Sequence, residues 1–145
     1  MDKRVTDWEV LYSFNLSAVG NRYPVLARLS ISNAHSLCVL DLRVFKNDKP
    51  TRTGVSLSPS EFHWLIDLLK NKQEGHISSI KKLTVLRVWD GVRITTQKRL
   101  RRNEIHLLVP ELTMLLDFEP KISEILDAQA NATGINFKVD DKNVI

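Results

Sequence analysis

Residues 40–69, LDLRVFKNDKPTRTGVSLSPSEFHWLIDLL, restrict the fold of this chain more than any other stretch. Apolar and polar side chains alternate up to Phe45, which predicts a strand. The segment Lys46–Thr53 contains Asn, Asp, Pro and Thr and is expected to be a loop. Val55–Leu57 resumes strand alternation, and Pro59 opens a helix that extends to Lys70. A strand, a basic loop, a second strand and a helix in this order predict an α+β unit.

The residues around the start of that helix contain a helix-capping signal. Ser58 is a favoured N-cap, and Pro59 follows at a position where a missing N–H costs little. Glu61 falls at the third helical position, so Ser58 and Glu61 are expected to form a capping box. Apolar residues then follow at helical spacing: Phe62, Leu65, Ile66 and Leu69.

Two parts of this plan recur later in the chain. LRVF at 42–45 is matched by LRVW at 86–89, and LSPSEFHWLIDLL is matched by LVPELTMLLDF, at offsets of 44 and 51 residues. The second match aligns Leu57, Pro59 and Leu65 with Leu108, Pro110 and Leu116. We therefore predict an internal duplication within one domain, 1–145, with repeat one at about 8–70, repeat two at about 76–130 and a short strand or loose tail at 131–145.

Alternation and breaker residues place the remaining elements. Strands are expected at Trp8–Leu16, Val25–Ser32, Leu37–Phe45, His76–Trp89 (one or two strands) and Ile105–Val109; helices are expected at Pro110–Phe118 and from Pro120 to about Ala130. The predicted fold class is α+β, with two unequal repeats of antiparallel strands followed by a helix and a curved sheet.

Asp90-Gly91 is a hairpin signal. We prefer a three-residue loop, Asp90–Val92, because it pairs Trp89 with Arg93 and separates polar from apolar faces. The polar face would then hold Val85, Arg87, Trp89, Arg93, Thr95, Gln97 and Arg99, and the inner face Leu86, Val88, Ile94 and Thr96.

Composition places the chain among globular proteins, with 43% hydrophobic residues. The single cysteine, Cys38, is expected to be a small buried residue. There is no apolar run long enough to cross a bilayer and no secretory leader, so no membrane partner and an intracellular setting are expected, with nucleus or cytoplasm left open.

The net charge of +4 is unevenly distributed. Residues 70–102 hold ten Lys or Arg against Glu74 and Asp90, whereas residues 103–145 hold eight acids against three lysines. This asymmetry suggests a basic surface for a polyanion, although a solvated charged surface would give the same counts.

An arginine and an aromatic ring stand two residues apart in both echoed strands, Arg43 with Phe45 and Arg87 with Trp89. Rings that stack on bases beside cations that meet phosphates are typical of single-stranded nucleic-acid binding. Packed rings with snorkelling arginines are the structural alternative. The remaining candidate binding residues are Lys46, Lys49, Arg52, Arg93, Lys98, Arg99, Arg101 and Arg102. Trp89 is expected to be exposed beside Arg87 and Arg93, and Trp64 to be buried on its helix.

Signals for catalysis are weak. His63 and His106 have no third partner at ligand spacing, and there is no glycine-rich phosphate loop, nucleophile motif or paired acidic motif. We predict no enzymatic activity, no cofactor and no metal site.

The stretch VLDLRVFKNDKPTRTGVSLSPSEFHWLIDLL resembles the carboxy-terminal domain of the positive cofactor four family of transcriptional coactivators. The matching motifs are Asp41-Leu42-Arg43, the basic loop Lys46–Arg52, Gly54-Val55-Ser56-Leu57 and Pro59. The resemblance covers 25–70 and, less closely, 77–118. It implies a curved four-stranded antiparallel sheet with a helix, acting as a dimer on single-stranded or melted DNA. A chain with two such units is also similar to the Whirly and Pur-alpha proteins.

By position, the resemblance makes Arg43 and Arg87 the strand arginines and Phe45 and Trp89 the strand-end rings. The resulting expectation is a non-enzymatic single-stranded DNA-binding protein in transcription, replication or repair, which forms homo-oligomers. Two alternatives stay open: a single-stranded RNA-binding protein, and a protein-interaction or scaffold module that dimerises through the same fold, for which Phe45 and Trp89 would be buried.

Overall fold

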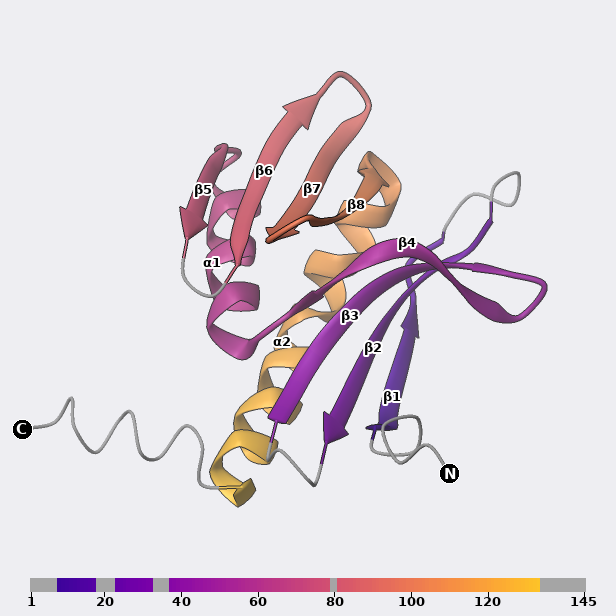
Figure 1. Ribbon diagram of the computed structural model, residues 1–145, viewed down its shortest axis with the longest axis vertical. Helices are drawn as coiled ribbons and strands as arrows, with labels where there is room; N and C mark the ends of the chain where they lie inside the picture. The colour runs from indigo at the N-terminus through magenta and orange to yellow at the C-terminus, as the bar shows by residue number, and fades with distance from the viewer. Residues whose placement is uncertain (1–7, 18–22, 33–36, 79–80, 134–145) are drawn as a thin grey trace, which may run out of the picture.

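The computed structural model describes residues 8–17, 23–32, 37–78 and 81–133. Figure 1 shows its elements in chain order: β1 Trp8–Asn15, β2 Val25–Ser32, β3 Leu37–Lys46, β4 Lys49–Leu57, α1 Pro59–Lys70, β5 Gly75–Ser78, β6 Lys82–Val88, β7 Gly91–Lys98, β8 Arg101–Leu108 and α2 Val109–Thr133. The predicted strand or tail at 131–145 is helix up to Thr133, and its remaining residues lie outside the described part of the chain.

The strands form two four-stranded antiparallel sheets, ordered β1-β2-β3-β4 and β5-β6-β7-β8. Each sheet follows the chain as a meander and is followed by one helix (Figure 1). The predicted α+β class, with strands and then a helix in each half, is confirmed. β4 and β8, the last strands of the two sheets, lie next to each other, so the sheets meet along these edges.

One hydrophobic core serves both halves. Alternate residues of each strand are buried, such as Leu40 and Leu42 of β3 or Ile105 and Leu107 of β8, as expected for a sheet with one covered face. The helices cover these inner faces and contact each other, and α2 contacts both sheets. Cys38 is 4% exposed, as predicted.

Helix α1 has the predicted bounds because its start is specified locally. The Glu61 N–H donates to Ser58 Oγ (3.2 Å) and the Ser58 N–H donates to Glu61 Oε1 (2.8 Å), which completes the capping box. At the start of α2, Glu111 Oε1 takes the role of Glu61 and accepts from the Leu108 N–H at 2.9 Å. Lys81, which directly precedes β6, ion-pairs with Glu61 at 3.3 Å and so links the start of β6 to the start of α1.

The two sequence echoes do not mark equivalent positions, which corrects the predicted alignment. LRVF lies on β3, the third strand of its sheet, whereas LRVW runs from β6, a second strand, into the following turn. The strand–helix junctions do correspond, but at an offset of 50: fully buried Leu57 and Leu65 match fully buried Leu107 and Leu115. Pro59 and Pro110 therefore differ by one helical position.

The predicted register of the hairpin at Asp90-Gly91, between β6 and β7, is wrong. Val88 pairs with Gly91 and Leu86 with Arg93, so Trp89 and Asp90 form the turn. A side chain at residue 91 would collide with the Leu107 carbonyl, so the close approach of β8 makes Gly91 a strand residue. Val85 is consequently buried, whereas Leu86 is 46% exposed, the reverse of the prediction.

A predicted loop is much shorter than expected, and a predicted break between two helices is absent. The expected loop Lys46–Thr53 is mostly hairpin strand, because Asn47 and Asp48 make a tight turn by taking φ of 53° and 64°. Pro120 lies inside the continuous helix α2 and does not restart it. Packing of Ile122 and Leu126 in the core outweighs the one helical hydrogen bond that proline removes.

The tryptophans are only partly as predicted. Trp89 is 95% exposed, in agreement with the prediction. Trp64 is half-buried rather than buried, because its helix face turns toward β5, where its ring lies over Gly75.

Candidate nucleic-acid interface

A β-bulge in β1 changes which face its side chains occupy. Val10 pairs with Ser30, but Tyr12 pairs with Leu29, so Leu11 is the extra residue. In a regular strand, the alternating residues from Trp8 to Leu16 would share one face. The bulge instead leaves Phe14 on the core side, against Phe118 at 5.0 Å, and turns Trp8 and Val10 onto the outer face.

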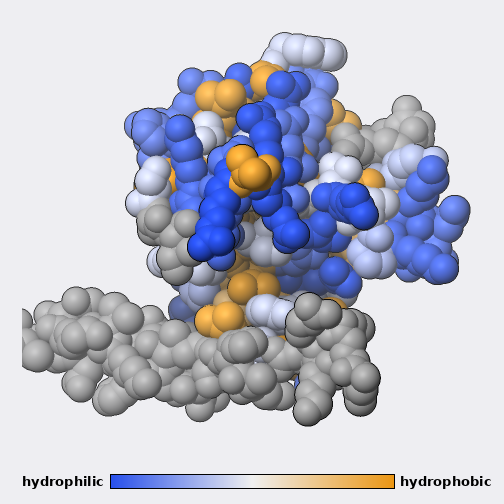
Figure 2. All heavy atoms as spheres, viewed as in Figure 1, coloured by the Kyte–Doolittle hydropathy of each residue, from blue (hydrophilic) through white to orange (hydrophobic). Residues whose placement is uncertain are grey.

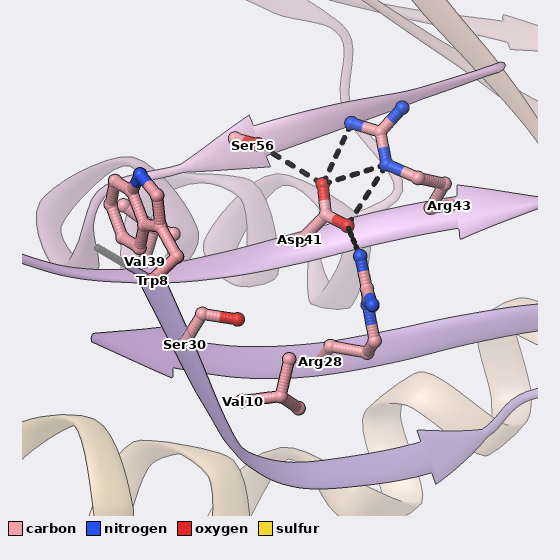
Figure 3. A pocket seen from close by; sticks show the side chains of 8 residues that line it. All are labelled: Trp8, Val10, Arg28, Ser30, Val39, Asp41, Arg43 and Ser56. Carbon is pink, nitrogen blue, oxygen red and sulfur yellow. Dashed lines mark hydrogen bonds and ion pairs between the residues drawn. The ribbon is translucent and has the colours of Figure 1, made fainter. Parts of the chain in front are cut away.

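On that outer face lies a pocket of about 440 Å³, the outer pocket. Trp8, Val10 and Val39 give it apolar walls, and Figure 3 shows Arg28 and Arg43 on either side of Asp41. The complete lining is Trp8, Val10, Arg28, Ser30, Val39, Asp41, Arg43 and Ser56. Trp8 remains 44% exposed, so part of its indole ring is available to a planar ligand.

Asp41 is the centre of a charged network beneath this pocket. Its carboxylate accepts from Arg28 Nη2 (3.1 Å), Arg43 Nε (2.9 Å) and Nη2 (2.8 Å), and Ser56 Oγ (3.0 Å). Burial alone would raise the pKa of Asp41, but the hydrogen bonds and charges of Arg43 and Arg28 and the Ser56 hydroxyl hold it below its ordinary value. With two arginines on one carboxylate, the network keeps a net positive charge.

The register of β3 on β4 explains why these residue types occur together. Asp41 pairs with Ser56, and Arg43 pairs with Gly54. A Cβ at residue 54 would lie 2.9 Å from Arg43 Cζ, so glycine leaves the room in which the guanidinium folds across β4. Arg43 Nη1 then donates to the Thr51 carbonyl at 2.9 Å. The Asp-Leu-Arg and Gly-Val-Ser motifs are thus two halves of one network.

A second, larger hollow lies where β4 meets β8. This inter-sheet groove has a volume of about 940 Å³ and is lined by Arg43, Arg52, Thr53, Ser56, Arg101, Arg102, Asn103 and Glu104. Arg52 and Arg101 are exposed, and Arg102 pairs only with Glu104 among the described residues, at 3.2 Å. Arg43 and Ser56 line both hollows, so the groove adjoins the outer pocket.

The groove also continues to the tip of the β7–β8 hairpin. A third hollow there is lined by Lys98, Arg99, Leu100 and Arg101, and Arg101 belongs to the groove as well. We call the three connected hollows the binding track. Figure 2 shows one face of the molecule, which is largely hydrophilic and has a central hydrophobic spot framed by strongly hydrophilic groups.

The binding track includes only some of the predicted site residues. Arg43, Arg52, Lys98, Arg99, Arg101 and Arg102 line it. Trp89 lies in the turn before β7 and Arg87 pairs with Val92 near its start, whereas Arg99 follows its other end. The two ends of β7, Gly91 and Lys98, are seven strand steps or about 24 Å apart. The predicted cations of the hairpin tip therefore line the binding track, whereas the predicted ring Trp89 lies outside it.

The other predicted residues have local partners or lie aside. Phe45 is half-buried, and Arg28 Cζ lies 4.9 Å from its ring centre. This cation–π contact helps to hold Arg28, which bonds Asp41, in place. Lys46 lies over the Tyr23 ring at 5.3 Å, and Arg93 pairs with Glu104 at 3.4 Å. Lys49 is exposed on β4 near the hairpin turn.

Sequence reasoning missed Trp8 and Arg28. Both stand in strands that were predicted correctly, but a bulge leaves no mark in the alternation, and Arg28 gains its role only through the pairing with Asp41. Arg28 Nε is buried and, within the described residues, makes no hydrogen bond.

Comparison with known proteins gives no further guide, because no family model, no curated protein and no solved structure matches this chain. Among the described residues, no helix has the length and apolar character needed to cross a bilayer. The same residues contain no group of three or more His, Cys, Asp or Glu placed to hold a metal ion.

Proposed function

We propose that this chain is a non-enzymatic, intracellular single-stranded DNA-binding protein whose ligand lies along the binding track. The observation that carries the proposal is that the three hollows adjoin one another, with the partly exposed Trp8 at one end and exposed arginines in the other two. The resemblance of residues 25–70 to the positive cofactor four family points to the same ligand.

The chemistry of the track favours an unpaired strand. A base can stack on Trp8 only if its face is free, which is not the case inside a duplex. Arg52, Arg101 and Arg102 supply charge for successive phosphates, and binding releases the counterions that those phosphates hold. Arg28 and Arg43 are fixed by Asp41 and contribute positive potential at the pocket floor.

The proposal is tested by fluorescence anisotropy with one labelled sequence as single-stranded DNA, single-stranded RNA and duplex DNA, each at several salt concentrations. We expect tightest binding to single-stranded DNA and an affinity that falls as salt rises. Equal affinity for duplex, or no binding at low salt, would refute the proposal. Tighter binding to RNA would make single-stranded RNA the ligand. No binding to any of the three nucleic acids would favour the scaffold alternative.

Trp8→Ala is expected to weaken binding to the single strand by about 1–3 kcal/mol, the range for one stacked base. Trp89→Ala is the matched control, because Trp89 is 95% exposed but lies outside the track. Both variants should keep the thermal stability of the wild type within a few degrees. A loss of affinity in Trp89→Ala with none in Trp8→Ala would restore the strand-end ring as the stacking residue.

A further inference from the structure

Leu100, at the tip of the β7–β8 hairpin, is fully exposed. It stands between two pairs of cations, Lys98 and Arg99 before it and Arg101 and Arg102 after it. An isolated exposed leucine is ordinary on a protein surface, but a leucine at the tip of a four-cation hairpin that adjoins a binding groove is not.

Two features of this tip are unfavourable for the free protein. Arg99 takes a φ of 58°, a left-handed conformation that costs an arginine more than the glycine or asparagine usual in such turns. The turn between β3 and β4 has Asn47 and Asp48 in the same conformation. Lys98 also pairs directly with Arg101 across the hairpin, which places like charges side by side.

Nothing among the described residues relieves that repulsion, because Lys98, Arg99 and Arg101 have no acidic partner there. The Gln97 side chain holds the turn by donating to the Arg99 carbonyl at 2.7 Å. The hairpin therefore presents one apolar side chain at a fixed point inside a concentrated positive charge. A polyanion with an apolar surface between its charges would satisfy both properties.

We propose that Leu100 is a wedge that enters the base stack where a single strand meets a duplex, so that the protein recognises such junctions and opens their first base pair. The proposal rests on the proposed function, since the single-stranded arm would occupy the groove. An inserted leucine partly unstacks a base step, as apolar wedges do in other DNA-binding proteins. The four cations would meet the phosphates of the two diverging strands.

A nucleic-acid junction fits this tip better than an anionic lipid surface. One leucine supplies little apolar area for a membrane, where stable attachment takes a larger apolar face or a second anchor. The position of Arg101 favours the junction over the lipid surface. Arg101 lines both the tip and the groove, so a strand bound in the groove would lie next to Leu100.

The test compares Leu100→Ser with Leu86→Ser, a control at a leucine that is 46% exposed on the same sheet but outside the track. The ligands are a forked DNA with 2-aminopurine at its first base pair and the single-stranded arm alone. The wild type and Leu86→Ser should prefer the fork by about tenfold, the factor that burying one leucine can supply, and should raise 2-aminopurine fluorescence. Leu100→Ser should bind the fork and the single-stranded arm with equal affinity and should not raise 2-aminopurine fluorescence.

An unchanged fork preference and an unchanged fluorescence rise in Leu100→Ser would overturn the wedge. The wedge would also be overturned if Leu100→Ser lost only its sedimentation with phosphatidylserine vesicles, a result that would assign the tip to a lipid surface. Failure of the wild type to bind the single-stranded arm would instead refute the proposed function.

Discussion

Replacing Arg52 and Arg101 together by glutamate should lower affinity for a single-stranded oligonucleotide about a hundredfold at low salt. The two arginines lie on different sheets and face the same groove, so a strand in the groove would meet both. Each reversal replaces an attraction of about 0.7 kcal/mol by a repulsion of similar size, a total of about 1.4 kcal/mol or tenfold per site. The slope of log affinity against log salt should also flatten by roughly 1.4, or 0.7 for each lost phosphate contact.

The control for this variant is Lys82→Glu with Arg87→Glu. Both residues are exposed on β6 and outside the binding track, and the change in net charge is the same. We expect the control to lose no more than a few-fold in affinity, measured by anisotropy over the same salt series. An equal loss in the two variants would mean that net charge, and not the groove, attracts the ligand.

Asp41→Asn should destabilise the fold by about 3 kcal/mol, the low end of the range for breaking a buried ion pair. The carboxylate is 8% exposed and bridges Arg28 and Arg43, whose side chains are 21% and 20% exposed. Without its charge, two arginines are left facing each other at the pocket floor. Urea unfolding measures the loss, and Asp67→Asn, on the exposed face of α1, should change stability by less than about 0.5 kcal/mol.

The contribution of Asp41 should also depend on pH in one direction. Its pKa is lower in the folded chain than its ordinary value of 3.8, so its stabilising contribution is complete above that value and is lost as the pH falls through the folded pKa. The stability difference between wild type and Asp41→Asn should therefore be constant near neutral pH and shrink below about pH 4. A difference that grew on acidification would contradict the network described here.

Elements whose start and end depend on nearby residues were predictable from the sequence. The start of α1 follows from Ser58, Pro59 and Glu61, and the bounds of β2 follow from its alternation between the breaks on either side. In both segments the local preference and the final packing agree, so no distant contact overrides the pattern.

Features set by distant contacts were not predictable. The sequence alone indicates a turn at Gly91, but the close approach of β8 makes it a strand residue. The sequence likewise indicates a helix break at Pro120, but core packing keeps α2 continuous through this residue. The bulge at Leu11 moves Trp8 to the face that carries Arg28 and Asp41. For the proposed site, the sequence pointed to the cations of the β7–β8 tip, whereas the position of Trp8 depended on a one-residue shift in register.

Photo-crosslinking tests the central claim most directly, because it locates the strand on the protein. A single-stranded oligonucleotide of 4-thiothymidine would be bound, irradiated and mapped to peptides by mass spectrometry. The account predicts adducts in three separated segments that line the binding track: Trp8–Val10, Arg52–Ser56 and Lys98–Glu104. Adducts confined to the β6–β7 turn around Trp89, with none in β4 or β8, would contradict it.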